Sequence, residues 1–185
     1  MNIKEISKQL KEILEVAIIA AVIVLPIRMF IFQPFIVSGA SMDPTFHTGD
    51  YLIVDEISYR FNEPQRGDVV VFEYPNDPSQ KFIKRIIGLP GETIEVSEGK
   101  VFLIQDSEKI QIQEDSYLDK KVITPYDKKM TLTSTQYFVM GDNRVASYDS
   151  RRWGALPRDL IIGKSIIKIF SLPKALTPSI NILSK

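Results

Sequence analysis

A serine in a loop of small residues is the first candidate for chemistry in this sequence. Ser41 lies in the segment Val37–Thr45, where Gly39 and Ala40 permit close approach of the backbone and Pro44 fixes the turn that follows. A serine hydroxyl attacks a carbonyl carbon only when a nearby base takes its proton. Because most serines in glycine- and proline-rich loops are plain turn residues, Ser41 needs a base elsewhere in the chain to count as a nucleophile.

His47 is the first candidate for that base, since it is the single histidine of the chain. It lies in the polar segment Phe46–Asp50, which leads into a predicted strand. A histidine in such a loop is commonly solvated and serves as a base only when a carboxylate orients it. The sequence therefore favours a solvated His47.

Lys84 is the second candidate for the base, and it lies in the apolar segment Lys81–Ile87. Strand alternation places Lys84 on one face together with Phe82 and Ile86. A lysine amine acts as a base near neutral pH only if its pKa falls from about 10.4, and burial lowers the pKa because the charged form loses its hydration. The alternative is an edge-strand lysine whose amine reaches past its neighbours into solvent.

The densest group of polar side chains lies in the segment Met140–Gly154, where a predicted strand ends. We predict that Asp149 and Arg151 form an ion pair, which Arg85 joins from the strand of the candidate base. Ser147 is then placed to orient the amine, as the third group orients the base in a catalytic triad. The alternative is a surface loop whose salt bridges contribute little to stability.

The elements that must position these residues are mostly β-strands. After residue 50, short runs of alternating apolar residues are separated by proline and glycine, which is typical of strands. The predicted strands are Tyr51–Val54, Asp68–Phe72, Lys81–Ile87, Thr93–Val96, Val101–Ile104, Gln136–Met140 and Ile161–Phe170. Tight turns are predicted at Pro75–Pro78, Pro90–Gly91 and the hairpin tip Glu98–Gly99. Residues 105–135 are polar and weakly patterned, and we interpret them as a variable surface insertion without chemistry.

An apolar stretch near the start predicts one transmembrane helix. Residues 13–33 are long enough as a helix to cross a bilayer core of about 30 Å, and Pro34 cannot continue the helix. The lysines within residues 1–12 favour a cytoplasmic N-terminus. We therefore expect a single-pass protein of the cell membrane, with residues 34–185 as an extracytoplasmic catalytic β domain. A cleaved signal peptide and a buried apolar helix are the alternative interpretations.

The composition excludes several other chemistries. The 23 basic and 23 acidic residues leave no positive excess of the kind that nucleic-acid binding needs. The absence of cysteine excludes disulfides, thiolate metal sites and thiol nucleophiles, and one histidine cannot form a zinc-binding cluster. We therefore expect no nucleic-acid partner, no metal and no organic cofactor.

Four ordered segments together resemble the bacterial type I signal peptidases, also called leader peptidases, and in particular their compact Gram-positive-like members. These segments are Ser41–Thr45, Arg66–Phe72, Lys84–Glu92 and Gly141–Arg144, the last continuing to Gly154. Members of this family are membrane-anchored serine endopeptidases that remove signal peptides from exported preproteins after small residues. The resemblance implies this activity, preproteins and the lipid bilayer as partners, and an open, largely antiparallel β structure.

The resemblance also implies roles for individual residues. It implies Ser41 as the nucleophile and Lys84 as the general base of a Ser–Lys dyad that forms an acyl-enzyme, with Ser147 as the partner of the amine. The implied supporting network consists of Arg85, Asp142, Asp149 and Arg151. The backbone amide of Ser41 is implied as a donor of the oxyanion hole. Gly39 stands where longer members carry a serine whose hydroxyl adds a second donor, so backbone or water must replace that hydroxyl. Ser41 and Gly39 are therefore the two candidate oxyanion positions.

The substrate of such an enzyme binds as an extended strand, and the sequence offers it two edges, Phe35–Gly39 and Lys81–Lys84. Two other functions stay open. A self-cleaving repressor-type Ser–Lys peptidase has a similar catalytic fold, but it begins with a DNA-binding helix-turn-helix in place of an apolar segment. An inactive membrane-anchored peptide-binding protein is the other alternative, and the presence of both Ser41 and Lys84 argues against it.

Overall fold

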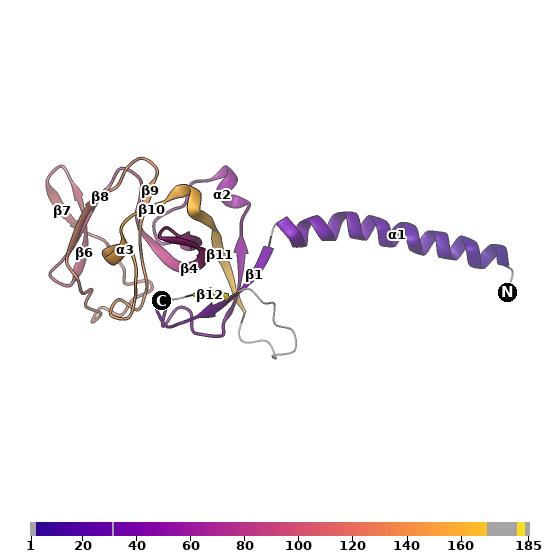
Figure 1. Cartoon of the computed structure of the whole chain (residues 1–185), viewed down its shortest axis with the longest axis horizontal. Helices are drawn as coiled ribbons and strands as arrows, with labels where there is room; N and C mark the ends of the chain where they lie inside the picture. Colours follow the sequence, from indigo (N-terminus) through magenta and orange to yellow (C-terminus); the bar gives the residue numbers. More distant parts are fainter. Residues whose placement is uncertain (1–2, 31, 170–180, 184–185) are drawn as a thin grey trace.

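The computed structural model of the protein describes residues 3–30, 32–169 and 181–183, and it consists of one long helix followed by a β-rich body (Figure 1). The helices are α1 (Ile3–Phe30), α2 (Ser58–Phe61), α3 (Ser150–Trp153) and the 3₁₀ helix η1 (Arg158–Leu160). The strands are β1 (Phe32–Ser38), β2 (Tyr51–Asp55), β3 (Val69–Tyr74), β4 (Asp77–Gly88), β5 (Thr93–Ser97), β6 (Lys100–Gln105), β7 (Glu108–Gln111), β8 (Lys128–Thr131), β9 (Gln136–Met140), β10 (Leu156–Pro157), β11 (Ile161–Ile169) and β12 (Asn181–Leu183). The mostly β architecture predicted from the sequence is confirmed.

Each predicted strand is present, although some of the ends differ, and the predicted end of the last strand, Phe170, lies outside the described residues. Strand β9 has the predicted bounds, whereas β4 begins four residues before the predicted Lys81. The hairpin tip at Glu98–Gly99 is also confirmed, since both residues have positive φ, 54° and 74°, as a two-residue hairpin turn requires. The sequence does not predict β7, β8, β10 or β12, because strands of two to four residues are too short to show a period of two.

The larger sheet has the strand order β10-β9-β4-β12-β1-β2-β11-β3, and β3 also pairs with β4. The six strands from β4 to β3 therefore form a closed ring. Among the described strands, β12 alone pairs in parallel, with β1 on one side and β4 on the other. This differs from the open structure that the family resemblance implies, because β12 fills the gap between β1 and β4.

A smaller antiparallel sheet has the order β7-β6-β5-β8 and packs against the end of the larger one. Their shared core contains Ile87 from β4, Ile94 from β5 and Phe138 from β9, all fully buried. The two sheets therefore meet at the carboxyl ends of β4 and β9, which are the strands that lead into the polar segments of the sequence.

Strand β4 is buried on both faces. Ile83 packs in a core cluster with Phe35 and Leu52, while Phe82 and Ile86 pack in a second cluster on the other face. Burial of each such apolar side chain stabilises the fold by about 1.5–3 kcal/mol. This apolar packing offsets the cost of burying Lys84, which lies between Phe82 and Ile86 on the same face of the strand.

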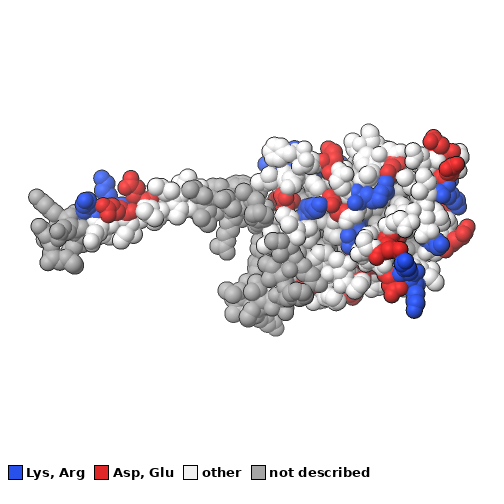
Figure 2. Space-filling view, turned by 180° about the vertical axis from the view of Figure 1, so that it is seen from behind, with Lys and Arg blue, Asp and Glu red and all other residues white. Residues whose placement is uncertain are grey.

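Helix α1 extends away from the β-rich body (Figure 1). In Figure 2 its charged side chains gather toward its outer end and uncharged ones follow. The helix ends at Phe30, and Gln33 and Pro34 already lie in β1, so the predicted helical end at residue 33 is wrong. The reason is that β1 pairs with β2 from Phe32 onward, which requires an extended backbone. Within the described ranges, no helix combines the length and the apolar character that a bilayer crossing requires.

Candidate active site

The structure brings Ser41 and Lys84 together, as the sequence predicts. Lys84 is on β4 and Ser41 lies in the turn after β1, and the Lys84 Nζ is 2.7 Å from the Ser41 Oγ. Both residues are completely buried. The Lys84 Nζ also donates a hydrogen bond of 2.9 Å to the carbonyl oxygen of Ile83. The amine is thus directed at the hydroxyl by its own strand.

Burial lowers the pKa of Lys84 to about 7, because the ammonium form loses its hydration among apolar neighbours. The carboxylates of Asp149 and Asp142 oppose this shift, since negative charge favours the ammonium form. The net result is an amine that is neutral in a large share of molecules near pH 7. Such an amine can accept the proton of the Ser41 hydroxyl.

The loop after β9 holds the turn that carries Ser41. The backbone amide of Asn143 donates to the Ser41 carbonyl oxygen at 2.9 Å, and the Asn143 side chain donates to the Ala40 carbonyl oxygen at 3.1 Å. Gly141 lies so close that an added Cβ would collide with the Ser41 carbonyl oxygen and with the side chain of Ser147. The position therefore requires glycine for close approach of two backbone segments.

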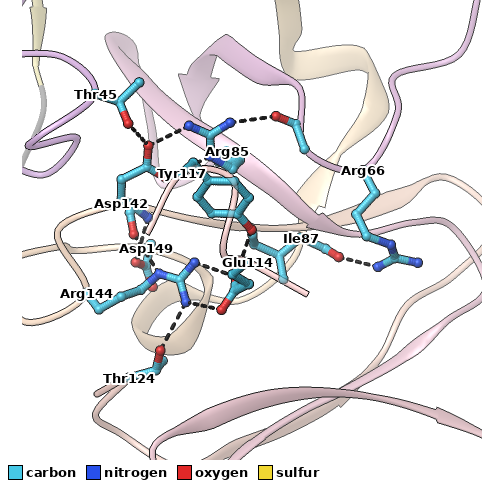
Figure 3. A network of polar contacts seen from close by, with 12 residues as sticks. Thr45, Arg66, Arg85, Ile87, Glu114, Tyr117, Thr124, Asp142, Arg144 and Asp149 are labelled. Carbon is cyan, nitrogen blue, oxygen red and sulfur yellow. Dashed lines mark hydrogen bonds and ion pairs between the residues drawn. The ribbon is translucent and has the colours of Figure 1, made fainter. Parts of the chain in front are cut away.

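Arg85 forms a two-pronged ion pair with Asp142, with distances of 2.8 and 2.6 Å. Asp142 also accepts a hydrogen bond from Thr45, next to the nucleophile turn, and Arg85 donates to the Gly67 carbonyl oxygen (Figure 3). The prediction that Arg85 joins the pair of Asp149 is therefore wrong. Arg85 is paired with Met140 across β4 and β9, so the carboxylate just beyond Met140 is the nearer partner.

The predicted ion pair of Asp149 and Arg151 is confirmed. Two guanidinium nitrogens donate to the carboxylate at 2.8 and 2.7 Å, and both side chains are fully buried. Asp149 also caps α3 and accepts from the backbone amide of Gly141 at 3.1 Å. The Asp149–Arg151 pair therefore fixes the start of the site loop at Gly141, and the Arg85–Asp142 pair fixes the residue after it.

Ser147 is buried beside Gly141, but its Oγ has no hydrogen-bond partner among the described residues. The predicted contact with the Lys84 amine is thus absent from this part of the structure. The carbonyl oxygen of Ile83 is bonded to the amine instead. Sequence analysis missed this group because a backbone carbonyl has no residue-type signal.

The predicted oxyanion donors differ in their availability. The amide of Gly39 donates to the Thr48 hydroxyl at 3.0 Å, and that hydroxyl donates to the Gly39 carbonyl oxygen at 2.8 Å. Gly39 therefore offers no free amide here, which leaves the amide of Ser41 from the predicted pair. The His47 side chain is 60% exposed and lies 3.8 Å from the carboxylates of Asp43 and Asp50, in agreement with a solvated loop histidine.

The predicted surface insertion contributes to the site, so the expectation that it holds no chemistry is wrong. Glu114 accepts two hydrogen bonds from the fully buried Arg144 of the site loop, at 2.8 and 2.5 Å (Figure 3). Tyr117 places its ring 4.0 Å from the Arg85 guanidinium and donates its hydroxyl to Glu114. Glu114 and Tyr117, which the sequence predicts to lie in a solvated loop, instead contact the arginines that support the site.

Comparisons with known proteins identify the family of the chain. The profile of the family described as "Signal peptidase, peptidase S26" matches residues 10–170. The chain is 37% identical over 171 residues to the probable signal peptidase I-1 of Synechocystis sp., covering 87% of this chain and 83% of that protein. It is 34% identical to signal peptidase I T of Bacillus subtilis, covering 83% of this chain and 81% of that protein. A crystal structure of a signal peptidase I from Enterococcus faecalis V583 is 30% identical, with a TM-score of 0.46, and the match covers 56% of this chain and 97% of that one. The chain belongs to the signal peptidase family, peptidase S26, and is a serine peptidase.

Proposed function

We propose that this protein is a membrane-anchored endopeptidase that cleaves signal peptides from exported preproteins after small residues, with Ser41 as nucleophile and Lys84 as general base. The observation that carries the proposal is the 2.7 Å contact between two completely buried side chains, one of them an amine with a pKa lowered to about 7. The relatives named signal peptidase I support the substrate class.

In the proposed mechanism, the neutral Lys84 amine takes the proton of the Ser41 hydroxyl as the Oγ attacks the carbonyl carbon of the scissile bond. The Ser41 backbone amide donates to the developing oxyanion. The C–N bond then breaks, and the leaving amine takes the proton back from Lys84. A water molecule that Lys84 deprotonates hydrolyses the acyl-enzyme and restores the serine.

The arginines around the site neutralise the two carboxylates of the site loop. Asp142 and Asp149 are each paired with a buried arginine, Arg85 and Arg151. Because their charge is balanced, the two carboxylates shape the loop without holding Lys84 permanently protonated. Ser147 orients the Lys84 amine once a peptide is bound.

We place the membrane anchor in the apolar part of α1, from residue 13 to Phe30, with residues 1–12 on the cytoplasmic side and the β-rich domain from β1 onward on the extracytoplasmic side. The apolar side chains Ile13, Leu14 and Val16 on α1 are each at least 60% exposed, which is costly in water and favourable in lipid. An anchor joined directly to β1 keeps Ser41 near the surface where a translocated preprotein emerges.

The test is a cleavage assay with the purified full chain and a preprotein whose signal peptide ends in Ala-x-Ala. Ser41→Ala and Lys84→Ala should each lower kcat by at least about 10³-fold, because each removes one half of the dyad. His47→Ala is the matched control and should keep most of the activity. Full activity of Ser41→Ala would exclude it as the nucleophile, and loss of activity in His47→Ala alone would restore a histidine mechanism.

The pH profile tests the base separately. Protonated Lys84 cannot accept a proton, so kcat/KM should rise with pH through the pKa of about 7 and then level off. A rising limb near pH 10 would contradict a buried, neutral amine.

A further inference from the structure

Strand β12 occupies the position between the two edges that the sequence predicts for a peptide substrate. Ile182 is paired with Val37 and Leu183 with Ser38 of β1, and Leu183 is paired with Phe82 of β4 on the other side. The chain's own backbone therefore fills the groove beside the dyad.

The direction of β12 is that of the acyl side of a substrate. It runs parallel to β1, which leads to Ser41, and parallel to β4, which carries Lys84. Leu183 is paired with Ser38 and with Phe82. Ser41 follows Ser38 by three residues, and Lys84 follows Phe82 by two. At about 3.3 Å per residue, the dyad therefore lies roughly 7–10 Å beyond Leu183 along the strand direction. The residues that follow in a peptide of this direction therefore lie closer to the dyad.

The groove has room for one strand. Neighbouring strands lie about 4.8 Å apart, so β1 and β4, each paired with β12, are separated by about two such spacings. A substrate strand that pairs with the same backbone groups cannot enter while β12 is in place. Occupation by β12 and by substrate is therefore mutually exclusive.

We propose that β12 is an intramolecular competitor of the substrate, a product-like strand that must leave the groove before a preprotein binds. The inference rests on the proposed function. A competitor in the same chain raises the apparent KM by the inverse of the fraction of molecules with an open groove and leaves kcat unchanged. Occupation of the groove in about three-quarters of the molecules would raise KM about fourfold.

The experiment compares Ile182→Pro with Ile182→Ala in the full chain. Since β12 has a strand on each side, the Ile182 amide faces one of them, and proline removes this donor whereas alanine keeps it. With a soluble Ala-x-Ala peptide substrate, Ile182→Pro should lower KM at least about threefold at unchanged kcat, while Ile182→Ala should stay near the wild-type value. A synthetic peptide of residues 179–185 should then inhibit Ile182→Pro competitively.

The outcomes separate this inference from the proposed function. Equal KM values for the wild type and Ile182→Pro, with normal cleavage by both, would refute the competitor and leave the peptidase assignment standing. Failure of the synthetic peptide to compete would also refute the competitor. Intact-mass measurement gives a further check, because a chain shortened within residues 181–185 would show that β12 is a substrate and not a competitor. Absence of cleavage by both proteins would refute the proposed function itself.

Discussion

Strand β4 and the segment 112–127 both contribute to the candidate active site, but they do so by different means. Strand β4 is paired along its length with β3 and β9, and this ladder fixes Lys84 and Arg85 at defined positions. None of the residues in the fully described segment 112–127 lies in a helix or strand, and the segment reaches the site through the side chains of Glu114 and Tyr117.

The two regions hold the same loop at different residues. Arg85 of β4 binds Asp142, while Glu114 of the segment binds Arg144, two residues further along the loop (Figure 3). In each case the loop residue is fully buried and charged, so its partner is required for stability. The geometry of the catalytic centre therefore depends as much on an irregular segment as on the central sheet.

Removing the β4 side of this arrangement should have the largest effect. Arg85→Met leaves the buried carboxylate of Asp142 without its ion pair and should cost about 3–5 kcal/mol of unfolding free energy, measured by urea denaturation. The unpaired negative charge should also raise the pKa of Lys84, because Asp142 already favours its ammonium form. Since the active form is the neutral amine, the rising limb of kcat/KM should move to higher pH.

The control for this prediction is Arg158→Met. Arg158 pairs with the largely exposed Glu63, and neither carboxylate that acts on the Lys84 pKa is among its partners. This variant should leave the pH limb in place. An unchanged limb in Arg85→Met would show that Asp142 does not act on the base.

Removing the partner on the segment should have the next largest effect. Glu114→Gln keeps the shape of the side chain but removes the negative charge that pairs with the buried Arg144. It should lower the unfolding free energy by about 2–3 kcal/mol. Asp115→Asn is the matched control, because its pair with Lys120 is exposed and should be worth less than about 0.5 kcal/mol. Equal unfolding free energies for the two variants would mean that the segment does not hold the loop.

The same contrast explains what the sequence could predict. Lys84 lies in an apolar strand segment, and Asp149 and Arg151 lie two residues apart, so local pattern and spacing identify them as candidates. The pattern alone leaves exposed alternatives open for each, and the family resemblance favours the buried site. Glu114 meets Arg144 over 30 residues through an irregular backbone, which leaves no periodic signal. Strand β12 is three residues long and pairs with strands that lie far earlier in the chain, so only the tertiary structure reveals it.

A smaller effect is expected from the aromatic contact between the two regions. Tyr117→Leu removes the ring that lies 4.0 Å from the Arg85 guanidinium and should cost about 1–2 kcal/mol. Tyr117→Phe keeps the ring and loses only the hydrogen bond to Glu114, so it should cost less. If the phenylalanine variant is as unstable as the leucine variant, the hydroxyl and not the ring makes the contribution.

The smallest change in stability is expected at Ser147. Its Oγ is buried without a hydrogen-bond partner among the described residues, so Ser147→Ala should change the unfolding free energy by no more than about 0.5 kcal/mol. Ser150→Ala is the matched contrast, because it removes the acceptor of the Val139 amide at 3.0 Å and should cost about 1–2 kcal/mol with kcat retained. If Ser147 orients the Lys84 amine in the peptide complex, Ser147→Ala should lower kcat at least about tenfold at unchanged stability. If kcat is unchanged, the Ile83 carbonyl oxygen, which already binds the amine in this structure, is sufficient to orient the base.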